Sequence, residues 1–137
     1  MTRILFVCVH NSGRSQMAEA FARHLGVGSL AAESAGTMPG DAINPIVTEA
    51  MRERGIDISH HKTKMVTQAM VNRADRVFTM GCTIDETCPA TFGPLDDWGL
   101  EDPTGKPLPV VRRVRDQVEA KVAALLRELT SVAKPGG

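Results

Sequence analysis

Residues 3–25 read RILFVCVHNSGRSQMAEAFARHL, and this stretch decides the fold. Its first part holds a continuous apolar run over residues 4–9, which is expected of a strand buried on both faces of a parallel sheet. Residues 10–13 have the composition of a turn, and residues 17–25 then carry apolar side chains at helical spacing. A buried strand, a short turn and an amphipathic helix in succession predict the start of an α/β domain.

Strands and helices continue to alternate along the rest of the chain. The patterns predict a weak strand over 31–35, a helix over 44–55, a short helix over 67–72, a third strand over 76–80 and a long amphipathic helix over 111–129. Asn44 followed by Pro45 is typical of a helix start. Residues 81–109 are rich in glycine, proline and acids, so we expect loop there, with room for a turn of helix near Ile84. We expect one three-layer α/β domain over 1–133 and a frayed tail over 134–137, while the strand order stays open.

Composition restricts the class of protein. The chain has 137 residues, of which 42% are hydrophobic, and its net charge is zero, which argues against a nucleic-acid-binding or membrane-surface protein. The apolar run at 4–9 is far shorter than the roughly 18 residues of a spanning helix. Only three residues precede it, so we expect no signal peptide and a cytoplasmic location. An odd number of cysteines, three, favours reactive or metal-binding thiols over a structural disulfide framework.

The richest chemistry lies in residues 8–15, which read CVHNSGRS. A cysteine and an arginine separated by five residues can form a cradle for a tetrahedral oxyanion, because the loop N–H groups and the positive end of the following helix point inward. Arg14 can bind two oxygens with its fork, and the same field stabilises the Cys8 thiolate, to which Ser15 can add a hydrogen bond. The predicted substrate-binding residues are Val9, His10, Asn11, Ser12, Gly13 and Arg14. The alternative is a buried strand cysteine beside a surface arginine.

The pattern Cys8-x-x-Asn11-x-x-Arg14-Ser15 resembles the signature of the low-molecular-weight protein tyrosine phosphatase superfamily. Within it, further stretches resemble the thioredoxin-coupled arsenate reductases, and the resemblance reaches about residue 130. These stretches are Arg14-Ser-Gln-Met-Ala-Glu19, Ser34-Ala-Gly36, Asn44-Pro45, Asp57-Ile-Ser59, Trp98-Gly-x-x-Asp-Pro103 and Arg113-Val-Arg-Asp116. The resemblance implies a four-stranded parallel sheet flanked by helices.

The resemblance also implies a relay of three cysteines. Cys8 attacks arsenate, Cys82 attacks Cys8 and releases arsenite, and Cys88 takes over the bond to Cys82, each sulfur step being thiolate exchange. A regular helix would place Cys82 and Cys88 about 9 Å apart, too far for a disulfide, so we expect their segment to unwind when they bond. The alternative is that both pack as small core hydrophobes, and the Cys-x5-Cys spacing makes zinc less favoured.

Asp102 matches the superfamily's general acid, which protonates the leaving oxygen. Spacing alone does not separate it from Asp96, Asp97 and Glu101, any of which can be a solvated loop charge. Asn11 is expected to order the loop through side-chain hydrogen bonds to the loop backbone.

Some members of the branch bind potassium through residues that match Asn11, Glu19, Ser34 and an aspartate. Lys64 stands at the aspartate position here, and an ammonium beside Glu19 can take the place of the ion. We therefore expect no bound metal.

The sequence as a whole predicts an arsenate reductase for arsenic detoxification. Its expected partners are arsenate and thioredoxin, with reduced thioredoxin as electron donor, no bound cofactor, no nucleic acid, no membrane and a monomeric state. The first alternative is a low-molecular-weight tyrosine phosphatase, which is disfavoured because Thr104 and Gly105 replace the tyrosine pair that typically follows the Asp-Pro of that family. The second alternative is a non-catalytic oxyanion-binding or redox-sensing protein.

Overall fold

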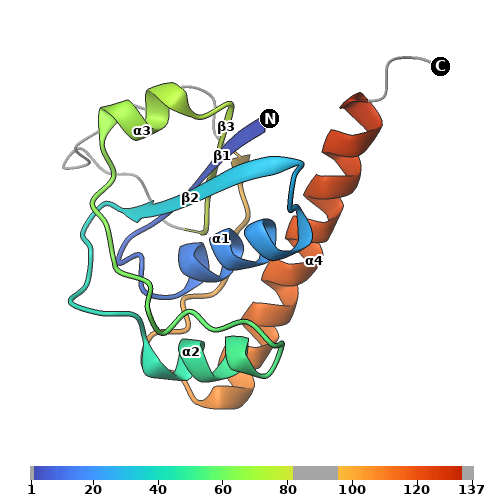
Figure 1. Cartoon of the computed structure of the whole chain (residues 1–137). Coiled ribbons are helices and arrows are strands. Elements are labelled where there is room, and N and C mark those ends of the chain that lie inside the picture. Colours follow the sequence, from blue (N-terminus) through green and yellow to red (C-terminus); the bar gives the residue numbers. More distant parts are fainter. Residues whose placement is uncertain (1, 82–95, 134–137) are drawn as a thin grey trace.

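The computed structural model describes residues 2–81 and 96–133, and within these ranges it contains both strands and helices (Figure 1). They are β1 (Thr2–Cys8), α1 (Arg14–Leu25), β2 (Leu30–Gly36), α2 (Pro45–Arg52), α3 (Gln68–Arg73), β3 (Arg76–Thr79), β4 (Asp96–Asp97) and α4 (Leu108–Ala133). No helix within these two ranges is both long enough and apolar enough to span a membrane.

The four strands form one parallel sheet in the order β2-β1-β3-β4, which confirms the predicted sheet. β1 is central and pairs with β2 along its whole length, from Thr2 opposite Leu30 to Cys8 opposite Gly36. β4 is a correction, because it lies in the region that the sequence predicted as loop. Its two residues are exposed acids with no apolar alternation, so no pattern announced a strand.

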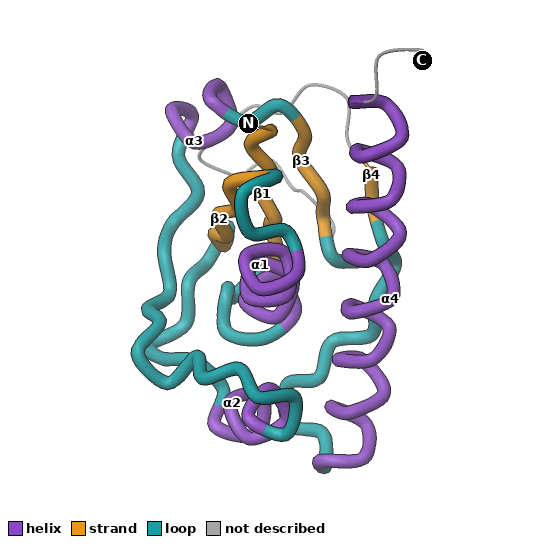
Figure 2. The backbone as a smooth tube through the Cα atoms, turned by 45° about the vertical axis from the view of Figure 1, so that its right-hand side comes forward, coloured by secondary structure: helices purple, strands orange, loops and turns teal. Residues whose placement is uncertain are grey.

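Two apolar layers cover the sheet, and β1 contributes to both. Ile4 and Phe6 face the larger cluster, which includes residues of α1, α2 and α4, whereas Leu5 and Val7 face a smaller cluster with Met70 of α3. Figures 1 and 2 accordingly show the sheet between α3 on one side and α1 on the other, with α4 packed beside α1. The uninterrupted apolar run of β1 thus reflects burial on both faces, as predicted, and the fold has three layers.

The chain starts its first two helices differently. Asn44 caps α2 with a hydrogen bond of 3.0 Å from the Ile46 N–H to its side-chain oxygen, and Pro45 takes the first helical position, as the sequence predicted. Gly13 precedes α1 and offers no side-chain cap to it. The first N–H groups of α1 therefore stay available to another acceptor at the carboxyl end of β1.

Candidate active site

A small pocket lies where β1 ends and α1 begins. Its lining combines a thiol, four further residues of the Cys8–Arg14 segment and two residues from the chain before α4. The lining residues are Cys8, His10, Ser12, Gly13, Arg14, Asp102 and Thr104. A pocket at the carboxyl end of a parallel strand, beside an uncapped helix N-terminus, is suited to an anion.

Cys8 lies at the buried end of this pocket, and only 3% of its surface is exposed. Its sulfur accepts a hydrogen bond of 3.1 Å from the Asn11 N–H and lies 2.8 Å from the Ser15 hydroxyl, the contact that the sequence predicted. Two polar groups, a backbone N–H and a hydroxyl, thus lie within hydrogen-bond distance of one sulfur. The geometry presents a buried, doubly hydrogen-bonded thiol to whatever fills the pocket.

The loop that carries these contacts needs a special backbone and a close neighbour. Asn11 has a φ of +52°, a left-handed conformation that asparagine tolerates better than most residues. A Cβ atom on Gly36 would lie 2.5 Å from the Val9 carbonyl oxygen, so the end of β2 must be glycine for the loop to pass over it.

Arg14 is buried and joins three parts of the chain. Its Nη1 donates hydrogen bonds to the carbonyl oxygens of Met80 (2.7 Å) and Leu100 (3.0 Å), and its Nη2 lies 3.7 Å from the Asp102 carboxylate. These bonds use both protons of Nη1 and leave those of Nε and Nη2 for a bidentate contact with an anion. Arg14 thereby fixes the end of β3 and the Asp102 segment around one pocket.

Asp102 is the acid that lines the pocket, and its carboxylate is about half exposed. Burial alone would raise its pKa, but hydrogen bonds from Thr104 and the positive charge of Arg14 lower the pKa below its usual value. The carboxylate is therefore ionised at neutral pH. For Asp102 to act as an acid, a bound dianion must raise its pKa or deliver the proton.

The other three acids considered from the sequence are held elsewhere. Asp96 pairs with Arg76, Glu101 pairs with Arg113, and Asp97 accepts hydrogen bonds from the Thr79 hydroxyl and the Gly81 N–H. Among the residues that the structure describes, the lining of this pocket includes no acid other than Asp102.

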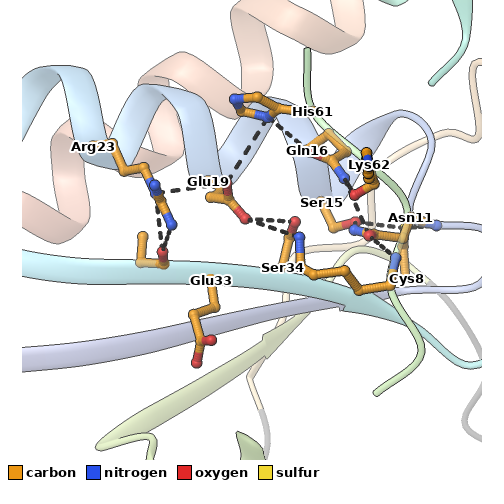
Figure 3. A network of polar contacts seen from close by, with 12 residues as sticks. Cys8, Asn11, Ser15, Gln16, Glu19, Arg23, Glu33, Ser34, His61 and Lys62 are labelled. Atoms are coloured by element: carbon orange, nitrogen blue, oxygen red, sulfur yellow. Dashed lines mark hydrogen bonds and ion pairs between the residues drawn. The ribbon is translucent and has the colours of Figure 1, made fainter. Parts of the chain in front are cut away.

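Behind the loop lies a buried polar network, drawn in Figure 3. The Asn11 side chain donates to the Ser15 hydroxyl (2.8 Å) and accepts from the Gln16 amide (3.1 Å) and the Lys64 N–H (2.9 Å). The expectation that this side chain binds the loop's own backbone is thus wrong, because it binds outward to α1 and to the chain before α3. Gln16 was not identified from sequence; its only signal was a buried amide among the apolar positions of α1.

Glu19 forms the far end of the network, and its buried carboxylate is surrounded by donors. Ser34 donates to Oε1 (2.8 Å), Lys64 Nζ lies 3.8 Å from Oε1, and Arg23 and His61 lie 3.5 and 3.9 Å from Oε2. An ammonium beside Glu19 was the arrangement expected from sequence. These residues do not fit a potassium ion, because cationic side chains already flank the carboxylate. Residues 2–81 and 96–133 contain no group of three or more His, Cys, Asp or Glu side chains that could hold a metal ion.

Cys82 and Cys88, and the turn of helix considered near Ile84, lie outside the described residues. The chain can be followed to Gly81, whose N–H donates to Asp97 at 2.7 Å. The carbonyl that Arg14 binds belongs to Met80, two residues before Cys82.

Comparison with known proteins places these features in context. Residues 3–134 match the model of the family described as low molecular weight phosphotyrosine protein phosphatase. Arsenate reductase 2 of Staphylococcus epidermidis is 36% identical over 121 residues, which cover 87% of this chain and 92% of the relative. A putative arsenate reductase of Halobacterium salinarum is 38% identical over 132 residues, covering 93% of this chain and 92% of the relative.

Solved structures agree with the sequence relatives. An arsenate reductase in the phosphate binding state superposes with a TM-score of 0.83 at 37% identity, covering 94% of this chain and 99% of the other. A thioredoxin-dependent arsenate reductase of Corynebacterium glutamicum has a TM-score of 0.78 at 30% identity. The superposition covers 96% of this chain and 63% of that one. An arginine phosphatase from Geobacillus stearothermophilus has a TM-score of 0.80 at 26% identity. The superposition covers 96% of this chain and 94% of that one.

Proposed function

Because the chain belongs to the low molecular weight phosphotyrosine protein phosphatase family, on its arsenate reductase branch, we propose that it reduces arsenate to arsenite through a relay of three cysteines. The pocket around Cys8 and Arg14 is the proposed binding site for the tetrahedral oxyanion. Arsenate and phosphate share this shape and charge, and a related structure is described in a phosphate binding state.

One contact carries the choice of reduction over hydrolysis. Arg14 lines the proposed anion site, and its Nη1 donates a hydrogen bond to the Met80 carbonyl at 2.7 Å. Cys82 stands two residues further along the sequence. The residue that Arg14 binds is thus followed closely in sequence by a second cysteine. A phosphatase needs no such thiol, whereas reduction of As(V) needs a second sulfur to supply one half of the electron pair.

The proposed first step joins Cys8 to arsenic. The Cys8 thiolate attacks As(V), an S–As bond forms, and one oxygen leaves as water after it receives a proton from the substrate or from Asp102. Nε and Nη2 of Arg14, the loop N–H groups and the α1 N-terminus hold the remaining oxygens. Ser15 and the Asn11 N–H stabilise the thiolate before attack.

The second step transfers the electrons. The Cys82 thiolate attacks the Cys8 sulfur, a disulfide forms, and the electron pair of the S–As bond leaves with arsenic as arsenite. Cys88 then attacks Cys82, which frees Cys8 and leaves a Cys82–Cys88 disulfide. Two thiols are oxidised for each arsenic reduced, so the electrons balance.

A dithiol donor must then reduce this disulfide, and we propose thioredoxin, because the Corynebacterium glutamicum neighbour is described as thioredoxin-dependent. The proposal places the protein in the cytoplasm as a monomer that serves arsenic detoxification. The catalytic domain covers residues 1–133, with 134–137 as a tail, and the chain works without a bound cofactor.

Phosphate-monoester hydrolysis is the second candidate, supported by the match to the low molecular weight phosphotyrosine protein phosphatase family. Cys8, Arg14 and Asp102 would suffice for it, so we expect a weak activity on small aryl phosphates. It leaves Cys82 and Cys88 without a role, and for this reason we place it second.

The test is steady-state oxidation of NADPH in the presence of arsenate, thioredoxin and thioredoxin reductase. Repeated turnover that depends on all components supports the proposal, and Cys8→Ser must abolish it because an alcohol is a much weaker nucleophile. Aryl phosphate hydrolysis without arsenate turnover would favour the phosphatase. A reaction that stops after one equivalent even with thioredoxin would favour a redox sensor.

A further inference from the structure

Gln16 is a buried polar residue that no step of the proposed mechanism uses. Its side chain is fully buried in the first turn of α1, and it is not part of the pocket lining. Both ends of its amide are engaged, however. Nε2 donates to Asn11 Oδ1 and to the Lys62 carbonyl, each at 3.1 Å, and Oε1 lies 3.0 Å from His61 Nδ1. Burial of an amide is unfavourable unless the amide is hydrogen-bonded, and these bonds offset that cost. A buried amide at this position therefore calls for a functional reason.

Backbone groups determine which way each hydrogen bond in this network runs. The Lys64 N–H can only donate, so the Asn11 atom that it meets is Oδ1, and Asn11 Nδ2 must donate to Ser15 Oγ. The Ser15 oxygen accepts that bond, and its own proton is left for the Cys8 sulfur at 2.8 Å. A thiolate has no proton to give, so in the ionised state Ser15 is the donor.

The same reasoning orients Gln16. The Lys62 carbonyl can only accept, so the Gln16 atom that it meets is Nε2, and Oε1 faces His61 as an acceptor. His61 must then carry its proton on Nδ1. The Glu19 carboxylate 3.9 Å from that nitrogen favours this tautomer, while burial lowers the pKa of His61 and keeps the ring neutral.

We propose that Gln16 is a positioning residue for the Cys8 thiolate, because it fixes the Asn11 amide in the orientation that directs the Ser15 proton to the sulfur. The donors then run in one direction, from His61 through Gln16, Asn11 and Ser15 to Cys8. Figure 3 draws these residues. Hydrogen bonds in such a chain strengthen one another in a buried setting. This inference rests on the proposed role of Cys8 as the nucleophile.

Gln16→Met keeps the size of the side chain but removes both of its donors. Asn11 then keeps only the Lys64 N–H on Oδ1, and its left-handed backbone loses one of its restraints. We expect a smaller population of the state in which Ser15 donates to the sulfur. Near neutral pH the observed alkylation of Cys8 should therefore be about tenfold slower, the effect expected for one weakened hydrogen bond to a charged group.

The measurement is the rate of Cys8 alkylation by iodoacetamide between pH 5 and pH 10, followed by mass spectrometry. Trypsin releases residues 4–14, a peptide whose only cysteine is Cys8, so the other thiols do not interfere. The buffer must contain no phosphate or sulfate, because these ions would fill the pocket. Other charges near the sulfur, those of Arg14, His10 and Asp102, are unchanged in the variant.

Gln16→Met is expected to move the alkylation profile to higher pH, with rates that converge on the wild-type rate at the alkaline end. A purely structural effect would change the rate by a similar factor at every pH. Met17→Leu is the matched control, because it alters a buried side chain of the same helix turn outside the network, and its profile should follow the wild type.

His61→Ala is a second variant in case Gln16→Met does not fold. His61 is only partly buried, and its loss leaves Gln16 Oε1 without this donor. We therefore expect the alkylation rate of Cys8 near neutral pH to fall about threefold, with the profile again moved to higher pH. Folded Gln16→Met with a wild-type profile, or a factor that is equal at all pH values, would overturn the inference. If Gln16→Met does not fold, a wild-type profile for His61→Ala would overturn it. The assay uses no arsenate, so its failure and the failure of the proposed function are distinguishable.

Discussion

Arg14→Lys is predicted to damage the site far more than a conservative charge substitution would suggest. The arginine donates through Nη1 to the carbonyls of Met80 and Leu100 while Nε and Nη2 remain for the anion. A lysine ammonium is a point donor and cannot fill both positions. The substitution therefore loses either the anion fork or the clamp on the two carbonyls.

The size of the loss follows from the number of bonds. Each hydrogen bond to a charged group contributes about 1.5–3 kcal/mol, and the fork makes two, so about 3–6 kcal/mol of transition-state stabilisation is at risk. This corresponds to a fall of about 10²- to 10⁴-fold in kcat/KM. The same factor should appear for arsenate reduction and for aryl phosphate hydrolysis, because both use the anion fork.

The assay measures kcat/KM for both reactions in Arg14→Lys and in a matched control, Arg113→Lys. Arg113 is exposed and forms one ion pair with Glu101, so its substitution should change neither rate by more than about twofold. A folded Arg14→Lys enzyme that keeps more than a fifth of wild-type kcat/KM would refute the reasoning.

Three further predictions address the relay, the cation and stability. Cys82→Ser and Cys88→Ser should each lose thioredoxin-coupled turnover but keep aryl phosphate hydrolysis; full coupled turnover in either would remove that cysteine from the relay. Exchange of potassium for sodium should leave kcat/KM and Tm of the wild type unchanged, since Lys64 already lies beside Glu19, and a clear potassium stimulation would contradict this. Hydrogen bonds from Arg112 and Arg115 lower the pKa of Glu53 to about 2. The ionised Glu53 therefore stabilises the fold at pH values above the pKa that it has in the unfolded chain, and this stabilisation is lost as the pH falls toward 2. The difference in unfolding free energy between wild type and Glu53→Gln should thus shrink from pH 6 to pH 2, and a constant difference would count against it.

The sequence predicts an element well where burial leaves a simple pattern. β1 is apolar from Ile4 to Cys8 because both of its faces are covered there, and α4 shows its apolar stripe because one side packs against α1. β4 has no such pattern. Its pairing with β3 is accompanied by side-chain bonds from Arg76 to Asp96 and from Thr79 to Asp97, contacts that only the fold creates.

The same limit applies to the site. Cys8, Arg14 and Ser15 are close in sequence and were found as a motif, whereas Gln16 and His61 are 45 residues apart and acquire their meaning only when α1 packs beside the chain before α3. The outward contacts of the Asn11 side chain were mispredicted for this reason. The roles of Cys82 and Cys88 stay predictions, since these residues lie outside the described part of the chain.

In the proposed mechanism this chain itself supplies two electrons to one arsenic atom through its thiols. A single-turnover experiment on the fully reduced protein, with arsenate in excess and no thioredoxin, tests it most directly. Arsenite is quantified, and the remaining thiols are mapped by alkylation and peptide mass. We predict one arsenite per chain, a disulfide between Cys82 and Cys88, and a free Cys8. No arsenite, or arsenite formed while all three cysteines remain reduced, would contradict the account.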